Sequence, residues 1–372
     1  MKQSKQSMQS KQSKQSTQSA QTMAGHSSKK KIDESIYFSI TSLYKYNTVF
    51  NFVIGGRGTG KTYGALKAEI LSGRKFILMR RTQTEIDQIA DSQSSDLGMS
   101  PFKKLNHDLG KKIYIRPLRK NIYVIMDETD EENHRHMGYA LALSTISNVR
   151  GFDASDIQDL IYDECVPEAH ARPIRKEGDA FLNAYETINR NREFNGEKPV
   201  YCYIFSNSNT IEAPLYFDLG ITDILERMID MHKYVKVIPD RSMSITRLHN
   251  KDFQTEKEKT VLYKFSRGTS FYKMSIENMF AYDDFSDIKS MPIVEYRPVV
   301  AIGDLYVYQH KSNGTYYCSF ARATCPEHFP DTEHGHQSFM AYWGRVMYGA
   351  YLDRQITFEK YKAKKLLTEI LL

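Results

Sequence analysis

The chain has 372 residues, of which 41% are hydrophobic and 26% charged, a composition that suits a globular protein and a length that favours two domains. No apolar run approaches the ~18 residues that a membrane-spanning helix needs, and the N-terminus lacks the apolar core of a secretory signal peptide. Residues 1–31 hold seven lysines and no acidic residue, so subtracting them from the net charge of +6 leaves −1 for residues 32–372, which excludes a global positive field around the folded body.

Residues 1–31 are Lys-Gln-Ser repeats without an aromatic residue. Such a segment cannot bury enough apolar surface to offset the entropy of ordering, so we expect a disordered basic tail. Two interpretations of the tail stay open. It is either a solvated leader or a weak tether for a polyanion.

The most informative motif is a complete G-x-x-x-x-G-K-T between a strand and a helix. Residues 49–54 are an apolar, β-branched and aromatic run, typical of a buried strand, and residues 63–71 are rich in helix formers. This is the arrangement of a P-loop, whose backbone N–H groups bind phosphate oxygens at a helix N-terminus. We expect Lys61 to reach the β- and γ-phosphates of ATP and the Thr62 hydroxyl to ligate Mg²⁺. The nucleotide-binding residues predicted from the motif are Gly55, Gly56, Arg57, Gly58, Thr59, Gly60, Lys61 and Thr62.

Strands and helices alternate through residues 32–235, which we assign to a P-loop ATPase domain. Alternation of this kind predicts an α/β fold with a mostly parallel sheet covered by helices. The runs at 113–115 and 122–126 resemble a hairpin. Beyond the P-loop, the predicted strands are 75–80, 113–115, 122–126, 139–147, 159–162 and 200–205, and the predicted helices are 84–90, 179–194 and 221–232.

The remaining chain is predicted to form a linker and a smaller domain. Residues 236–295 are polar, charge-rich and poorly periodic, so we expect a linker with little sheet of its own. In residues 296–372, the turn Ser312-Asn313-Gly314-Thr315 separates two β-rich runs, a strong hairpin signal. A strand at 299–303 precedes this hairpin, and helical patterns at 338–352 and 358–371 follow it.

A P-loop enzyme also needs an apolar strand that ends in Asp to hold Mg²⁺, and in hydrolases a following Glu can polarise the attacking water. Two pairs compete for this role, Asp127-Glu128 and Asp163-Glu164. The first pair ends a hairpin and runs into an acidic, solvated turn. The second is followed by a helix, a buried strand and then Asn207, a polar residue placed to sense the γ-phosphate. We therefore assign Asp163 to the metal and Glu164 to catalysis.

Several arginines are candidates for neutralising the charge that develops in phosphoryl transfer. Arg57 lies within the P-loop, Arg150 precedes Gly151 in a loop, and Arg190 and Arg192 lie at the end of a predicted helix. For any single one of them a solvated side chain is the default interpretation. Arg57 is the better candidate, since the loop would hold it near the phosphates. Arg80-Arg81, at the end of a predicted strand, fit either contact with nucleotide or nucleic acid or a surface salt bridge.

The four cysteines, Cys165, Cys202, Cys318 and Cys325, are scattered along the chain. Cys318 and Cys325 with His328 fit no zinc pattern well. We expect buried or idle thiols in a reducing cytoplasm.

The order of these motifs resembles that of the terminase-like DNA-packaging ATPases of small, short-tailed phages of the picovirus type. The resemblance covers most of residues 45–215 and is thin beyond about 236. It rests on residues 51–62, Leu78-Met79-Arg80-Arg81, Leu143-Ser144, Arg190-Asn191-Arg192-Glu193 and Phe205-Ser206-Asn207. It implies an ASCE-type P-loop NTPase core, a linker and a smaller C-terminal RNase H-like α/β domain.

By this resemblance, the protein is expected to work as a homopentameric ring that pumps double-stranded DNA through the portal, or connector, of an empty procapsid. It would act in the host cytoplasm, transiently at the portal vertex, without a membrane. A structural RNA is a further partner of some members. Arg190 matches the arginine offered to the neighbouring subunit's ATP, Arg150 a basic residue at the same interface, and Asn207 the motif that couples hydrolysis to motion.

Two other classes of function stay open, another ring NTPase on nucleic acid such as a helicase, and a P-loop switch protein that does not hydrolyse ATP. The Asp163-Glu164 pair argues against the switch. By the same resemblance, the C-terminal domain is expected to look like a nuclease that has lost its acidic cluster. A metal nuclease needs several convergent carboxylates, and Asp304 has no carboxylate partner at a suggestive spacing. We therefore expect this domain to grip nucleic acid or dock, and not to cut DNA.

Overall fold

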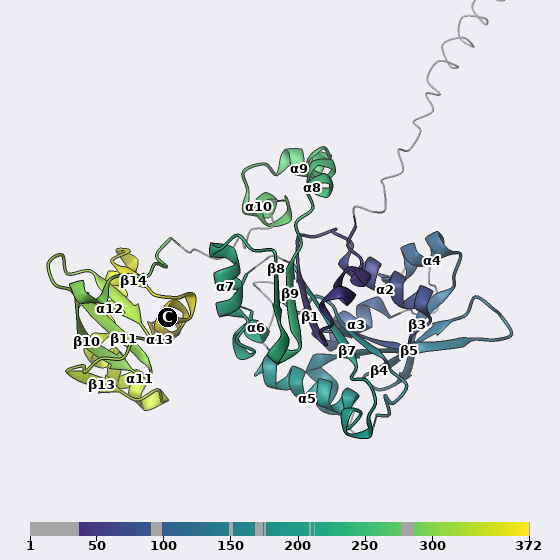
Figure 1. Ribbon diagram of the computed structural model, residues 1–372, viewed down its shortest axis with the longest axis horizontal. Coiled ribbons are helices and arrows are strands. Elements are labelled where there is room, and N and C mark those ends of the chain that lie inside the picture. The colour runs from purple at the N-terminus through teal and green to yellow at the C-terminus, as the bar shows by residue number, and fades with distance from the viewer. Residues whose placement is uncertain are drawn as a thin grey trace, which may run out of the picture. The chain divides into compact units, whose positions relative to one another are not determined.

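The computed structural model describes residues 37–90, 99–148, 152–167, 174, 176–207, 210–211, 213–276 and 286–371. These residues form two sheets, one of nine strands and one of five, each with its own helices (Figure 1). The α/β class predicted from the alternation is therefore confirmed.

The larger sheet is mixed, with the strand order β3-β4-β5-β2-β6-β7-β1-β9-β8. Its middle, from β5 to β9 in this order, is parallel, while β3, β4 and β8 pair in antiparallel fashion at the two sides. The strands are β1 (Phe50–Ile54), β2 (Phe76–Arg80), β3 (Ile113–Arg119), β4 (Ile122–Asp127), β5 (Arg135–Ala142), β6 (Asp159–Tyr162), β7 (Tyr201–Ser206), β8 (Val235–Ile238) and β9 (Met243–Arg247).

Helices cover both faces of this sheet, because the parallel strands are apolar on both sides. On one face lie η2 (Ile40–Tyr46), α2 (Lys61–Ser72), α3 (Gln83–Ile89) and α4 (Lys103–Leu109), packed on residues such as Val53, Leu78 and Phe205. On the other face lie α5 (Glu177–Asn189), α6 (Pro214–Asp218) and α7 (Thr222–Asp230), packed on Phe52, Leu160 and Ile204. Successive strand residues thus alternate between two cores.

Two predictions for the larger sheet were wrong in detail. The strand predicted at 139–147 begins earlier and ends at Ala142, after which η3 (Leu143–Asn148) turns the chain. The expectation of little sheet within residues 236–295 was also wrong, because β9 pairs with β1 along its whole length. The run Met243-Ser244-Ile245 is short and lies between charged stretches, so its strand character was hidden by its surroundings. Three helices follow it, α8 (Lys251–Glu258), α9 (Val261–Phe265) and α10 (Ser270–Ile276).

The smaller sheet has the order β13-β10-β11-β12-β14. Strands β11 and β12 are antiparallel and pair Tyr308 with Tyr317, which confirms the hairpin predicted around Asn313-Gly314. Its elements are η6 (Ile293–Glu295), β10 (Tyr296–Ile302), β11 (Leu305–His310), β12 (Tyr316–Ser319), β13 (Glu327–Phe329), α11 (Glu333–Phe339), η7 (Met340–Gly344), α12 (Arg345–Leu352), β14 (Ile356–Phe358) and α13 (Tyr361–Leu371).

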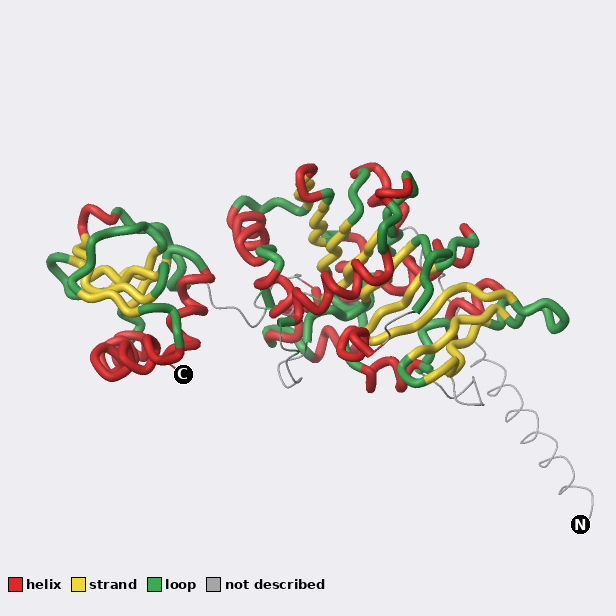
Figure 2. The backbone as a smooth tube through the Cα atoms, turned by 90° about the horizontal axis from the view of Figure 1, so that it is seen from below, coloured by secondary structure: helices red, strands yellow, loops and turns green. Residues whose placement is uncertain are grey.

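The two faces of the smaller sheet differ in what covers them. One face packs against α11, α12 and α13 through residues such as Val307, Met347 and Leu367 (Figure 2). The other carries a buried cluster of aromatic side chains, among them Tyr308 and Tyr317.

No described helix of the chain is both long and apolar enough to span a membrane. Cys165, Cys202 and Cys318 are buried and Cys325 is half-buried, all as free thiols.

A pair of buried carboxyl groups lies beneath the amino ends of the central strands. Glu69 of α2 is 1% exposed and Asp159 at the start of β6 is fully buried. Arg74 binds Asp159 through Nη2 at 2.8 Å and through Nε at 2.6 Å. Burial, together with the charge of Asp159, raises the pKa of Glu69 above its ordinary value, and burial likewise raises the pKa of Asp159. Between the ordinary pKa of glutamate and the raised pKa of Glu69, the folded protein therefore binds more protons than the unfolded chain does.

Glu69→Gln is expected to stabilise the protein, and to do so increasingly as the pH rises. Because the pKa of Glu69 is raised on folding, stability is lost as the pH rises above the ordinary glutamate pKa, and glutamine removes this loss. We expect a gain in melting temperature of a few degrees at pH 8, since 1 kcal/mol corresponds to about 2–4 °C in domains of this size. Thermal unfolding from pH 5 to 8 checks this, and parallel curves for the two proteins would contradict it.

Candidate nucleotide site

The G-x-x-x-x-G-K-T segment joins β1 to α2 as a turn that only glycine fits well. Gly58 and Gly60 have φ angles of 79° and 85°, in the left-handed region that other residues rarely adopt. Lys61 is the first residue of α2, so the loop ends at a helix N-terminus. The N–H groups there have no partner within the helix and attract anions. The local geometry is therefore suited to phosphate.

The Lys61 ammonium lies within the loop that it is predicted to serve. Its Nζ donates to the carbonyl oxygens of Gly55 at 2.8 Å and Gly56 at 3.1 Å. Burial lowers the pKa of Lys61 to about 8, against the opposing attraction of Asp163. Asn207 Oδ1 lies 3.4 Å from the same nitrogen. Asn207 follows β7, which pairs with β1, so the structure brings this predicted residue to the loop.

Thr62 follows the loop after β1, and Asp163 follows β6. These two strands are not neighbours, since β7 lies between them, yet the two side chains are in contact. Thr62 Oγ1 donates to Asp163 Oδ2 at 2.8 Å, and the Asp163 side chain is 2% exposed. A hydroxyl and a carboxylate supply the oxygen ligands that Mg²⁺ prefers. Since the two side chains are in contact, one cation is within reach of both, and the donor set fits this metal.

Arg80 holds both acidic residues of the predicted motif. It ends β2, the neighbour of β6, and its Nη2 binds Asp163 Oδ2 at 2.9 Å while Nη1 binds Glu164 Oε2. Glu164 itself is more than half exposed and has a φ of 56°, a strained conformation for a residue with a side chain. Glu164 thus differs in backbone strain and in exposure from Asp159 and Glu177, which are buried and paired with arginines.

Arg81 is not a surface residue, which excludes for it the surface salt bridge that was one of the two interpretations of the Arg80-Arg81 pair. It is 1% exposed, and its Nε donates to the fully buried Glu177 Oε1 at 2.8 Å. Tyr162 Oη contacts the same carboxylate oxygen at 3.4 Å. Removal of either charge would leave the other buried and unpaired, so this pair fixes the end of β2 to the start of α5.

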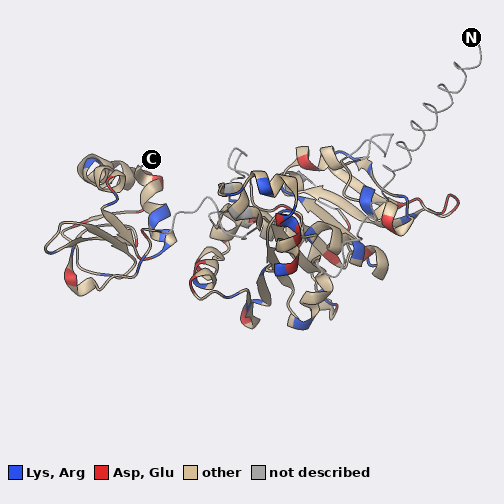
Figure 3. Cartoon of the chain, turned by 90° about the horizontal axis from the view of Figure 1, so that it is seen from above, with Lys and Arg blue, Asp and Glu red and all other residues tan. Residues whose placement is uncertain are grey.

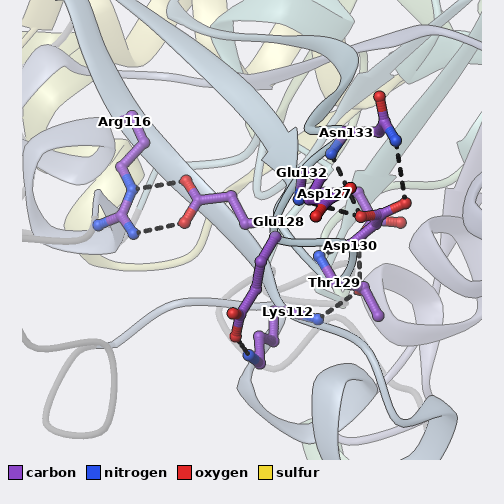
Figure 4. A network of polar contacts seen from close by, with 9 residues as sticks. Lys112, Arg116, Asp127, Glu128, Thr129, Asp130, Glu132 and Asn133 are labelled. Carbon is purple, nitrogen blue, oxygen red and sulfur yellow. Dashed lines mark hydrogen bonds and ion pairs between the residues drawn. The ribbon is translucent and has the colours of Figure 1, made fainter.

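The rejected pair, Asp127-Glu128, is engaged in a network of its own at the base of the hairpin (Figure 4). Asp127 accepts from the N–H of Thr129 at 3.0 Å and from Lys111 at 3.1 Å. Glu128 forms a two-point contact with Arg116, at 3.1 and 3.0 Å. Strand β4 is antiparallel to both of its neighbours, as the hairpin pattern predicted. These carboxylates therefore stabilise a turn away from the P-loop strand.

Arg190 lies at the opposite edge of the parallel strands from its own P-loop. It follows α5, from which the chain returns to the amino end of β7. Its Nη2 donates to the carbonyl of Phe152 at 2.6 Å, and Arg192 donates to that of Ser155 at 2.7 Å. Arg190 also has a strained φ of 49°. Arg150, the other predicted interface residue, lies outside the described residues.

Residues from outside the motif also line the loop, and no local pattern marked them. Tyr37 lies beside Gly60, and its ring is 5.8 Å from that of Phe253 in an edge-to-face arrangement. Lys257, also from α8, donates to the backbone carbonyl of Arg57, a residue of the P-loop. Sequence alone could place α8 near the loop only if β9 had been recognised as a partner of β1.

The carboxylates around the smaller sheet do not gather at one place. Among the described residues, no group of three or more His, Cys, Asp or Glu side chains could hold a metal ion. Asp304 is 79% exposed and lies 3.4 Å from Arg322 Nη2. Glu359 accepts instead from Ser319 and from the N–H of Phe320. That the predicted C-terminal domain does not cut DNA stays a prediction.

Basic and acidic residues are interspersed over the drawn elements, as the near-neutral charge of residues 32–372 predicts (Figure 3). Any contact with a polyanion therefore depends on local groups of side chains.

Comparison with known proteins identifies relatives of this chain. The DNA packaging protein of Bacillus phage phi29 is 26% identical over 262 residues, 68% of this chain and 68% of that protein. The DNA packaging protein of Bacillus phage B103 is 27% identical over 250 residues, 65% of this chain and 67% of that protein. A chain of the bacteriophage Phi-29 viral genome packaging motor assembly shares the fold, with a TM-score of 0.65 and 19% identity over 90% of this chain and 98% of that chain.

The family model described as Podovirus DNA encapsidation protein (Gp16) matches residues 32–302, from before the P-loop to the end of β10. Since the match covers most of the chain, the protein belongs to the Podovirus DNA encapsidation (Gp16) family.

Proposed function

We propose that this protein is an ATPase that drives double-stranded viral DNA into an empty procapsid. The observation that carries the proposal is the convergence of Lys61, Thr62, Asp163, Glu164 and Asn207 at one edge of the sheet. Membership of a DNA encapsidation family supports the cargo. The position of β7 between β1 and β6 supports assignment of the core to the ASCE type.

Each residue of the site would have a distinct role. The P-loop N–H groups and Lys61 bind and orient the phosphates of ATP, while Thr62 and Asp163 hold Mg²⁺. When bound, Mg²⁺ supplies positive charge that offsets the negative charge on the transferring phosphoryl group. Glu164 orients a water and accepts its proton. Because Arg80 binds Glu164 in the structure, this contact must be released before Glu164 can serve the water.

The position of Arg190 favours action on a neighbouring subunit. It lies across the sheet from its own P-loop, so it cannot contact its own ATP without a large rearrangement. In a homo-oligomeric ring, by family resemblance a pentamer, that edge could face the ATP of the next subunit. An arginine supplied in this way is worth ~10³–10⁵ in rate. Arg57, inside the P-loop, stays the candidate for a catalytic arginine within the same subunit.

Arg190→Ala is expected to abolish ATP hydrolysis while leaving ATP affinity unchanged, because the residue is remote from its own site. Mixing it with Lys61→Ala subunits, which keep Arg190, is expected to restore part of the turnover. Steady-state hydrolysis over a series of mixing ratios measures this. Arg192→Ala is the matched control, since it binds backbone carbonyls of the same loop. Lost ATP affinity, or no recovery at any ratio, would argue against a contribution between subunits.

The proposed partners follow from the family and not from the charge of the protein. They are double-stranded DNA, the portal of the procapsid and further copies of this chain. A structural RNA at the portal is not required by any feature of the described residues. The site of action is the portal vertex in the cytoplasm of the infected host.

Measurement of DNA-stimulated ATP hydrolysis, with and without empty procapsids, tests the proposal. A packaging motor should hydrolyse ATP faster with DNA and protect that DNA from nuclease only when procapsids are present. Strand displacement without procapsids would instead favour a helicase. Binding of ATP without phosphate release under any condition would favour a switch protein.

A further inference from the structure

A helical segment, residues 251–276, lies against the P-loop. It consists of α8, α9 and α10, which are grouped together in the fold (Figure 1). The segment follows β9, the partner of β1, and the N–H of Leu248 between them donates to the carbonyl of Ile54 at 2.7 Å. This hydrogen bond places the start of the helical segment next to the start of the P-loop.

The segment has a small core of its own. Phe253, Tyr263 and Ile276 are each at most 9% exposed. The rings of Tyr263 and Phe271 stack with their centroids 5.8 Å apart. Tyr272 Oη donates to Glu258 Oε1 at 3.1 Å and ties α10 to α8. This packing joins the three helices into one small unit.

Lys257 joins this unit to the P-loop. Its Nζ donates to the backbone carbonyl of Arg57 in the loop and, at 2.9 Å, to that of Ser275 in α10. The ammonium also lies 4.7 Å from the ring centroid of Tyr263 and 5.4 Å from that of Phe253. A cation between two aromatic faces and two carbonyls is held in place by several weak contacts. One side chain therefore bridges the loop and both ends of the segment.

Both hydrogen-bond acceptors of the Lys257 ammonium are neutral carbonyl oxygens. An ammonium forms stronger hydrogen bonds with charged acceptors. Lys61, the other lysine of the site, is in the same situation, because it too binds loop carbonyls. Burial lowers the pKa of Lys257 to about 8, which shows that its environment does not compensate the charge fully. Phosphate oxygens are stronger acceptors for an ammonium than carbonyl oxygens are. Negative charge in the loop should therefore change what Lys257 binds and how firmly.

We propose that Lys257 is a positioning residue that couples the phosphate charge in the P-loop to the helical segment 251–276. This inference rests on the proposed binding of ATP at the loop and adds a route by which the nucleotide state reaches the chain beyond β9. A triphosphate attracts the ammonium more strongly than a diphosphate does. The segment is consequently held more tightly against the loop with ATP than with ADP.

The test compares Lys257→Met with Lys257→Arg, which keeps the charge, and with Lys259→Met as a matched control. Lys259 lies in the same segment but pairs with Glu256 at 2.6 Å on the surface. Affinities for the slowly hydrolysed analogue ATPγS and for ADP are measured with each protein. Hydrogen exchange of residues 251–276 is followed with and without the analogue.

The wild type and Lys259→Met are expected to bind ATPγS more tightly than ADP and to protect the segment on binding. Lys257→Met is expected to lose about tenfold in ATPγS affinity, less in ADP affinity, and the protection of the segment. Lys257→Arg should recover most of both. A merely structural lysine would instead change exchange equally with and without nucleotide, which would overturn the inference.

The two proposals fail in different ways. If Lys257→Met binds both nucleotides and protects the segment as the wild type does, the coupling is wrong while nucleotide binding stands. If the wild type binds neither nucleotide, the proposed function itself is wrong. Thermal unfolding of Lys257→Met without nucleotide shows that it is folded, and Lys257→Arg decides the outcome if it is not.

Discussion

Lys61→Ala is expected to reduce ATP hydrolysis by at least ~10²–10³-fold, the range for the loss of one charge-stabilising donor in an active site. The β- and γ-phosphates lose the ammonium that the structure holds inside the loop. The fold should not suffer, because Lys61 is a buried charge whose pKa is lowered to about 8 by desolvation. Removing such a charge relieves a cost, so the melting temperature should stay the same or rise.

Phosphate release and thermal unfolding of the same preparation measure the two parts of this result. Lys67→Ala is the matched control, since Lys67 lies on the same helix and contacts the ring of Tyr63 at 5.8 Å. That variant should hydrolyse ATP normally. Unchanged turnover in Lys61→Ala would mean that the G-x-x-x-x-G-K-T segment is not the catalytic P-loop.

The elements with a strong local pattern were predicted well from the sequence. The apolar strand before the P-loop, the helix after it and the hairpin at Asn313-Gly314 are found close to their predicted bounds. Strand β9 was missed because its pairing with β1 is a long-range contact that its five residues do not reveal. With β9 missed, the attachment of residues 251–276 to the P-loop could not be seen either.

The site shows the same division. The proximity of Thr62 to Asp163 and of Asn207 to the loop could be predicted, because each residue follows a strand or belongs to the motif and parallel strands end at one edge of the sheet. Their roles stay predictions. The role of Arg80 could not be assigned, since its contact with Glu164 depends on β2 lying next to β6. The burial of Arg81 could not be predicted, since charged residues are rarely buried and its partner Glu177 is remote in sequence.

Glu164→Gln is expected to bind ATP and retain it, with hydrolysis reduced by ~10²–10⁴-fold, the contribution of a general base. The metal ligand Asp163 remains, so the nucleotide should still bind with Mg²⁺. Glutamine keeps an oxygen that can accept from Arg80 and has the same length, and the side chain is more than half exposed. The substitution should therefore leave stability within about 0.5 kcal/mol of the wild type.

Single-turnover hydrolysis with labelled ATP, followed by filtration, separates retention from loss of binding. The double variant Asp127→Asn, Glu128→Gln serves as the control for the choice between the two acidic pairs. In the wild type the two carboxylates bind Thr129, Lys111 and Arg116. The double variant should therefore lose some stability at the hairpin and keep its turnover. If the double variant were inactive and Glu164→Gln active, the catalytic carboxylates would belong to β4. That result would be hard to reconcile with the contact between Thr62 and Asp163, because a P-loop threonine and the metal-binding carboxylate must reach the same cation.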